Sequence, residues 1–192
     1  PAELDHTTRQ ERIKKLEELK LTVVVVGSVK TTMDSVMADI ALVGKVVGAP
    51  DKAKQVTEGM QKKLDTLKAK VATAKGKPKV YWELDATDPA KPYTVGPGNF
   101  VNDLIALAGG ENIFAQAGSP FAQVGAEQIV AANPDVIILS DAAYGISPES
   151  VKARKGWDVI AAVKSNKVFP IDDNLVSRPT ARVVDGLEAA MK

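Results

Sequence analysis

Two kinds of hydrophobic pattern occupy the first part of the chain. Residues 8–20 place apolar side chains on one narrow stripe in a field of charge, which predicts a solvent-facing amphipathic helix. The stripe consists of Ile13, Leu16 and Leu19. The β-branched run Leu21–Val26 follows without polar alternation, and it predicts a short strand buried on both faces.

A longer helical pattern comes next. From Met33 to about Lys75, apolar residues recur every three or four positions, with one stop at Gly48–Asp51 where Pro50 suits the first position of a new helix. The pattern predicts about 40 helical residues, which at about 1.5 Å per residue are too long for a crossover inside one small sheet. Their length favours a spine between two lobes.

From Val80 onward, short apolar runs alternate with short helical patterns. The predicted strands cover residues 80–84, 93–95, 135–140 and 167–172. The predicted helices cover residues 100–108, 126–133, 156–163 and 180–192. This alternation predicts an α/β fold, a mostly parallel sheet with helices on both faces in a Rossmann-like lobe.

Composition excludes several classes of function. The 192 residues carry a net charge of +1, so no basic excess indicates nucleic acid binding. The chain has no cysteine and one histidine, His6, which disfavours zinc sites and a Ser-His-Asp triad. Paired carboxylates occur, but no pattern places two of them across a scissile bond. We therefore predict neither enzymatic activity nor a cofactor or metal.

A Gly-Pro-Gly turn at residues 96–98 precedes the predicted helix that begins near Phe100. Gly96 and Gly98 match the first two glycines of a dinucleotide fingerprint, but Val101 replaces the third. Residues 27–32 likewise lack the glycine that a phosphate loop needs before its lysine. The turn is either a tight strand-to-helix connection or a point where a ligand approaches the backbone.

Aromatic residues gather around this turn in a chain with only 5% aromatics. Tyr81 and Trp82 lie in the predicted strand 80–84, and Tyr93 lies just before the turn. Strand ends in open α/β sheets line the ligand crevice, so these rings are candidates for ligand contact. Packing beneath a helix is the alternative for Trp82 and Tyr81.

From Thr31 onward, the order of segments resembles one class of bacterial transport protein. The segments are the long helical pattern, "KPKVYWEL", "YTVGPGNFVNDLIALAGGENIF", "FAQVGAEQIVAANPDVIILS", "GWDVIAAVKSNKVFPIDD" and "SRPTARVVDGLEAAMK". In this order they resemble the helical-backbone (class III) solute-binding proteins of ABC transporters, which deliver vitamin B12, ferric siderophores or haem. The resemblance implies two α/β lobes bridged by a rigid helix, with the ligand held in the cleft between them.

The resemblance also implies a division of the chain. Residues 1–30 correspond to a remnant of the N-terminal lobe, residues 31–76 to the interlobe spine, and residues 77–192 to the C-terminal α/β lobe. Most of the first lobe is then missing. A lone strand at Val23–Val26 would have unpaired edges, so we expect the chain to self-associate through this region.

Individual positions follow from the same resemblance. Glu127 corresponds to the glutamate that docks an arginine pocket of the membrane permease, and Arg178 lies where an anionic group of the ligand is reached. Phe121 stands where cobalamin-binding relatives often carry tryptophan. The expected ligand-binding residues are Trp82, Tyr93, Gly96, Gly98, Phe121 and Arg178.

The function implied is that of an extracytoplasmic substrate-binding component of an ABC importer. It would bind a metal chelate and deliver it to the permease without reacting with it. Two alternatives remain, a truncated doubly wound nucleotide-dependent enzyme and a sensory or structural module with the same fold. Nucleotide binding would favour the first alternative. Replacement of Glu127 by alanine separates transport from the second, because a sensor need not dock a permease.

Overall fold

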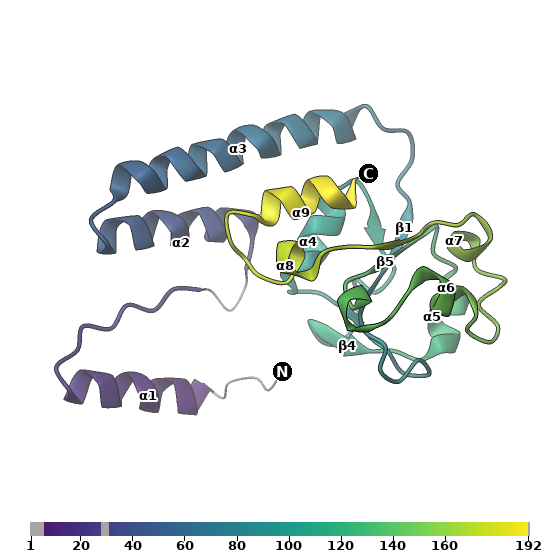
Figure 1. The fold of residues 1–192 in the computed structure, drawn as a ribbon, viewed down its shortest axis with the longest axis horizontal. Helices are drawn as coiled ribbons and strands as arrows, with labels where there is room; N and C mark the ends of the chain where they lie inside the picture. The colour runs from purple at the N-terminus through teal and green to yellow at the C-terminus, as the bar shows by residue number, and fades with distance from the viewer. Residues whose placement is uncertain (1–5, 28–30, 192) are drawn as a thin grey trace.

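The computed structural model describes residues 6–27 and 31–191 (Figure 1). Its N-terminal part contains α1 (His6–Glu18), α2 (Met33–Val46) and α3 (Pro50–Ala72). The rest is an α/β lobe in which short helices surround one sheet. The helices of the lobe are α4 (Phe100–Leu107), α5 (Ala126–Ala132), α6 (Pro148–Lys152), α7 (Ala161–Lys164), α8 (Asp173–Val176) and α9 (Val183–Ala190), with the 3-10 helix η1 (Ala142–Tyr144).

The sheet has the strand order β4-β2-β1-β5-β6, and β3 also pairs with β1. Its strands are β1 (Lys79–Asp85), β2 (Tyr93–Val95), β3 (Glu111–Asn112), β4 (Phe121–Gln123), β5 (Val136–Leu139) and β6 (Val168–Pro170). The β1–β3, β1–β5 and β5–β6 pairs are parallel, whereas β1–β2 and β2–β4 are antiparallel. The predicted α/β fold with a mostly parallel sheet is confirmed.

Each face of the sheet has its own hydrophobic core, because neighbouring side chains of β1 point to opposite faces. Trp82 packs on the face covered by α3, α4 and α9, and Tyr81 packs on the face covered by α5, α6 and α7. Leu67 of α3 and Leu104 of α4 are buried in the first core. A buried leucine contributes about 2–5 kcal/mol relative to alanine, so these contacts attach α3 firmly to the lobe.

The predicted spine is a helical hairpin rather than one continuous rod. α2 and α3 lie side by side and run in opposite directions (Figure 1). Gly44 lies where they touch, since a Cβ atom built on it would be 2.2 Å from the Cβ of Ala53. Pro50 begins α3 as predicted, and the 23 residues of α3 extend about 34 Å. Only α3 therefore has the length of a spine, and the assignment of residues 31–76 as an interlobe connection stays a prediction.

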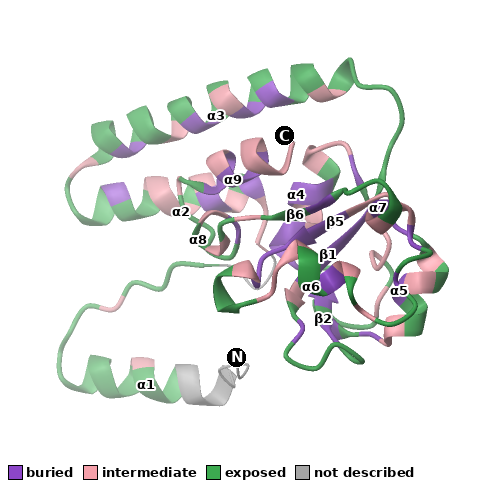
Figure 2. Ribbon diagram, turned by 45° about the vertical axis from the view of Figure 1, so that its right-hand side comes forward, coloured by how far each residue is buried: buried purple, intermediate pink, exposed green. Residues whose placement is uncertain are grey.

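The strand predicted at Leu21–Val26 is absent, and this prediction was wrong. The run has no regular secondary structure, and Val24, Val25 and Val26 are exposed (Figure 2). β-branched residues favour strands only where a neighbouring strand can pair with them, and none of the described strands pairs with this run. The predicted stripe of α1 is likewise not buried, because Leu16 is exposed. Residues 1–5 and 28–30 of the predicted N-terminal remnant lie outside the described residues.

Two predicted helices are shorter than expected. The pattern over 156–163 yields only α7, and the closing helix begins at Val183 rather than at Thr180. Trp157 and Ile160, which supplied the apolar spacing before α7, are buried from a loop. Their spacing therefore reflects packing on the sheet and not helical geometry.

Candidate functional site

Two exposed aromatic side chains share one face of the β2–β4 pair, and we call Tyr93 and Phe121 the aromatic pair. The register sets Tyr93 opposite Gln123 and Val95 opposite Phe121. In antiparallel strands this makes Tyr93 and Phe121 diagonal neighbours, at a spacing that aromatic rings can bridge. Their relative exposures are 42% and 60%, so both rings are available to a ligand.

The glycine turn lies beside the aromatic pair. The Gly96 N–H donates to the Pro120 carbonyl at 3.0 Å, and the Asn99 side chain donates to the same oxygen at 3.0 Å. A Cβ atom on Gly96 would lie 1.9 Å from the Ser119 carbonyl oxygen. Gly98 has φ +80°, a conformation that favours glycine. Gly96 is thus required because its backbone approaches Ser119 too closely for a side chain, and its N–H is already bonded to Pro120. Gly98, in contrast, is exposed and open to a ligand.

Trp82 is buried in the core, which corrects the expectation of an exposed ring at a strand end, although it lines a small hollow of about 70 Å³. Its side chain is 1% exposed, and its indole N–H donates to the Ser140 hydroxyl at 3.1 Å. β1 is a central strand with both faces covered, so Tyr81 and Trp82 are both buried. Packing, the alternative considered for Trp82, is what the structure shows.

Arg178 lies exposed in the loop between α8 and α9. Helix α8 separates this loop from β6, and the carboxyl end of β6 belongs to the edge of a parallel sheet where ligands bind in open α/β folds. Arg178 could therefore contribute a cation to a ligand at that edge. None of the described contacts joins it to the aromatic pair.

Glu127 is exposed in the first turn of α5, where the helix dipole favours a carboxylate. The Gly125 N–H donates to the Gln128 side chain at 2.8 Å, and the Ala126 N–H donates to the Ala90 carbonyl at 3.1 Å. The start of α5 is therefore tied to the loop that follows β1. This arrangement presents Glu127 to solvent on an ordered helix end.

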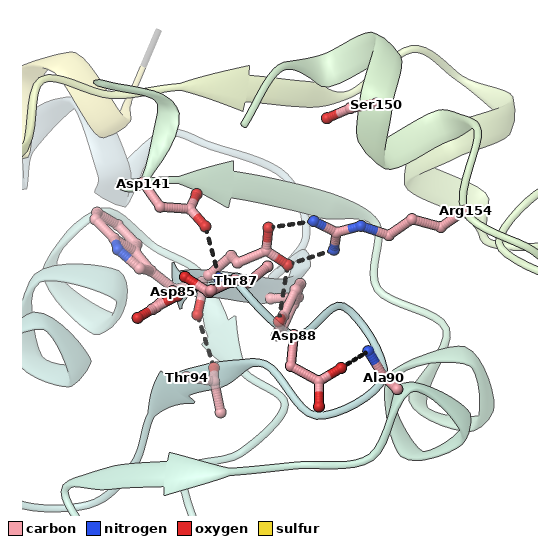
Figure 3. A network of polar contacts seen from close by, with 12 residues as sticks. Asp85, Thr87, Asp88, Ala90, Thr94, Asp141, Ser150 and Arg154 are labelled. Carbon is pink, nitrogen blue, oxygen red and sulfur yellow. Dashed lines mark hydrogen bonds and ion pairs between the residues drawn. The ribbon is translucent and has the colours of Figure 1, made fainter. Parts of the chain in front are cut away.

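A buried ionic network lies close to the loop that follows β1, and it was not predicted from the sequence (Figure 3). The Arg154 guanidinium donates to both carboxylate oxygens of Glu83, at 2.6 and 2.8 Å, and the Tyr81 hydroxyl donates to the same carboxylate at 3.1 Å. Burial and the negative charge of Glu83 raise the pKa of Tyr81, so its hydroxyl remains a donor. The Arg154 guanidinium also lies 4.6 Å from the centre of the Trp157 ring. A glutamate within an apolar strand was the available signal, because a buried charge requires a partner.

Asp141 is a second carboxylate in this network. Asp141 lies two residues after the end of β5 and is 3% exposed. Its Oδ2 accepts a hydrogen bond from the Ala86 N–H at 3.0 Å. Its Oδ1 has no hydrogen-bond partner among the described atoms. Burial, followed by the charge of Glu83, raises the pKa of Asp141 to about 6.

Two hollows occur beside α3, away from the aromatic pair. One, of about 380 Å³, lies between the start of α2, α3 and α4, and the other, of about 270 Å³, lies between α3, α4 and α9. Neither is lined by a residue expected to bind ligand. Across the described residues no cluster of histidine, aspartate and glutamate could hold a metal ion, and no helix is long and apolar enough to cross a membrane.

The sequence matches a known family over most of its length. The family model described as "Periplasmic binding protein" matches residues 4–175. The chain belongs to the periplasmic binding protein family. An uncharacterized ABC transporter substrate-binding lipoprotein, YvrC of Bacillus subtilis (strain 168), is 32% identical over 92% of this chain and 54% of its own length.

Other members of this periplasmic binding protein family are similar to the chain. A vitamin B12-binding protein of Vibrio parahaemolyticus is 27% identical over 91% of this chain and 61% of its own length. A solved structure of a possible iron-binding (periplasmic solute-binding) protein from Staphylococcus epidermidis ATCC 12228 is 25% identical, with a TM-score of 0.82 over 98% of this chain and 72% of that one. The chain thus spans little more than half the length of the curated relatives it matches.

Proposed function

We propose that this chain supplies the C-terminal lobe of an extracytoplasmic substrate-binding component of an ABC importer. Its ligand is a metal chelate of the corrinoid, ferric siderophore or haem class, which it delivers to a permease without chemical change. The family match supports the transport role, and the named relatives are binding proteins rather than enzymes. The observation that carries the ligand class is the exposed aromatic pair beside the glycine turn.

The aromatic pair suits a large and partly planar ligand. Two exposed rings on one strand face offer a rigid apolar surface that loses little conformational entropy on binding. Gly98, exposed beside them, leaves the backbone open to close approach. Arg178 supplies a cation that would orient a carboxylate or phosphate of the ligand. We infer that these residues line one wall of the ligand cleft.

The permease contact proposed for this lobe is Glu127. A carboxylate at an exposed helix start can pair with an arginine in two parallel hydrogen bonds. Glu127→Gln keeps the size of the side chain and removes its charge, and is expected to weaken binding to membranes that contain the cognate permease. An unchanged affinity of the Glu127→Gln variant would contradict this role.

We further propose that the chain self-associates through residues 21–27. The run exposes the β-branched side chains of Val24, Val25 and Val26, and residues 22–26 belong to none of the described strands, so this segment can pair with a second copy. Family membership and fold do not depend on this proposal.

The ligand proposal is tested by equilibrium dialysis with cobalamin, a set of ferric siderophores and haem. We expect saturable binding of one class, and at least a tenfold loss of affinity in Phe121→Ala. The matched control is Phe169→Ala, which removes an exposed ring from β6 at the opposite edge of the sheet and should bind as the unmodified chain does. Equal losses in the two variants would contradict a site at the aromatic pair.

A further inference from the structure

Two carboxylates are buried side by side at the carboxyl ends of β1 and β5, but only one arginine serves them. Glu83 is 0% exposed and uses both terminal nitrogens of Arg154. Asp141 is 3% exposed and has one oxygen without a hydrogen-bond partner among the described atoms. A buried carboxylate without its own cation destabilises the fold unless its hydrogen bonds offset the loss of hydration.

Asp141 holds one end of the loop formed by residues 86–92, which we call the bracket loop (Figure 3). Its Oδ2 accepts the Ala86 N–H, and this bond is buried. Within the loop, the Asp88 side chain accepts the Ala90 N–H at 3.0 Å. The bracket loop is therefore a stiffened segment with a defined anchor at its first residue.

The other end of the bracket loop is bonded to the segment that leads into α5. The carbonyls of Ala90 and Pro92 accept the N–H groups of Ala126 and Val124, at 3.1 and 3.0 Å. The Lys91 carbonyl accepts the Gln123 side-chain amide at 3.0 Å. Through these bonds the loop spans the distance from the buried carboxylates to the exposed helix start that carries Glu127.

We propose that Asp141 is a positioning residue for Glu127, because it anchors the bracket loop more strongly when ionised than when protonated. The inference rests on the docking role proposed for Glu127. In this proposal the buried network holds Glu127 in position, and that position depends on whether Asp141 is protonated.

The charges around Asp141 support a change at mildly acidic pH. The groups that face it are Glu83 and Tyr81 from β1, and Arg154 from the segment after α6. Burial and the charge of Glu83 raise the pKa of Asp141 to about 6, and the bond from the Ala86 N–H opposes this. Hydrogen bonds to an ionised acceptor are about twice as strong as neutral ones. The anchor therefore tightens as pH rises through about 6, although the ionised carboxylate is costly to the fold as a whole.

The test is a pH titration of backbone amide resonances in the full chain from pH 4.5 to 7.5. We expect the amides of Ala86, Ala126 and Glu127 to shift together with a midpoint near pH 6. Asp141→Asn keeps an acceptor for the Ala86 N–H and removes the charge, so it should abolish these shifts. The control is Asp88→Asn, an exposed carboxylate of the same loop, which should leave the midpoint unchanged.

Two outcomes would overturn the proposal. An Ala86 amide that shows no midpoint between pH 4.5 and 7.5, as the ordinary aspartate pKa of about 3.9 would give, would show that Asp141 does not carry the proton in this range. Titration of Ala86 without Ala126 and Glu127 would show that the bracket loop does not transmit the change. The titration requires neither chelate nor permease, so failure of the transport proposal would leave this result interpretable.

Discussion

Glu83 and Arg154 show what single residues contribute to this fold and how far the sequence reveals it. A glutamate in the apolar strand 80–84 predicts that a partner is needed, because buried charges are rarely unpaired. The partner comes from 71 positions later, and no spacing rule connects the two. Trp82 illustrates the same limit, since alternation assigns Tyr81 and Trp82 to opposite faces but does not say that both faces are covered.

Replacement of Arg154 should be strongly destabilising. Arg154→Met leaves the Glu83 carboxylate buried without its cation, and removal of one partner of a buried pair costs about 3–5 kcal/mol. Urea denaturation measures the loss. Lys155→Met, at the neighbouring exposed position, should change the free energy of unfolding by less than about 0.5 kcal/mol. Glu83→Leu combined with Arg154→Met should recover much of the loss, and no recovery would contradict the pairing as its cause.

Asp141 should give the stability a specific pH dependence. Its pKa in the fold, about 6, lies above the ordinary 3.8, so between these values the native state binds more protons than the unfolded state. The protonated Asp141 side chain therefore stabilises the native state relative to the ionised side chain. This contribution to the free energy of unfolding is complete below about pH 4 and is lost as pH rises through about 6. At about 1.4 kcal/mol per pKa unit, the loss is on the order of 3 kcal/mol.

Asp141→Asn isolates this contribution. As pH rises from 4 to 7, the unmodified chain should lose stability relative to the variant, because only the unmodified chain ionises at position 141. Urea denaturation at each pH measures the two free energies of unfolding. A difference that is constant over this range would show that Asp141 titrates normally in the fold.

Secondary-structure elements were predictable where local chemistry determines them. β1 and β5 follow from short apolar runs, and α4 begins where the Asn99 side chain accepts the Val101 N–H at 2.9 Å. Leu21–Val26 has the same composition as a buried strand. No strand among the described residues pairs with it, and it does not form a strand. The antiparallel return of α3 along α2 was also unpredicted, because a stop signal marks a helix end without giving the direction of the next helix.

Two glycines in the hairpin should respond oppositely to alanine. Gly59→Ala in α3 adds a methyl group where no atom lies within 4 Å, and the gain in helix propensity should stabilise the chain by about 0.5–1 kcal/mol. Gly44→Ala places its Cβ 2.2 Å from the Cβ of Ala53, so α2 and α3 must separate. Overpacking costs about 1–3 kcal/mol, which offsets the propensity gain. Thermal unfolding of both variants tests the hairpin, and stabilisation by Gly44→Ala would contradict it.

At the scale of the whole molecule, the order of segments made the lobe and its family predictable, while the placement of site residues was only partly so. The sequence correctly located the β2 strand and glycine turn, but the contact between that turn and Pro120 arises from folding. Phe121 and Tyr93 come together only through the β2–β4 register. The chain spans little more than half the length of the curated relatives that it matches.

Self-association is a property of the whole chain and should be visible in solution. Sedimentation equilibrium is expected to show a mass that rises with concentration, because the run Leu21–Val26 can pair with a second copy. Val25→Lys should reduce this association, whereas Val47→Lys, at an exposed valine just after α2, should not. A monomeric mass over a wide concentration range would exclude pairing through this run.

The most direct measurement is a map of where a bound chelate perturbs the amide resonances of the chain. We expect the largest changes, with whichever of cobalamin, ferric siderophore or haem binds, at residues 93–98 and 119–123, together with Arg178. Changes centred on the hollow between α2, α3 and α4, lined in part by Thr32 and Leu64, would contradict a ligand site at the aromatic pair.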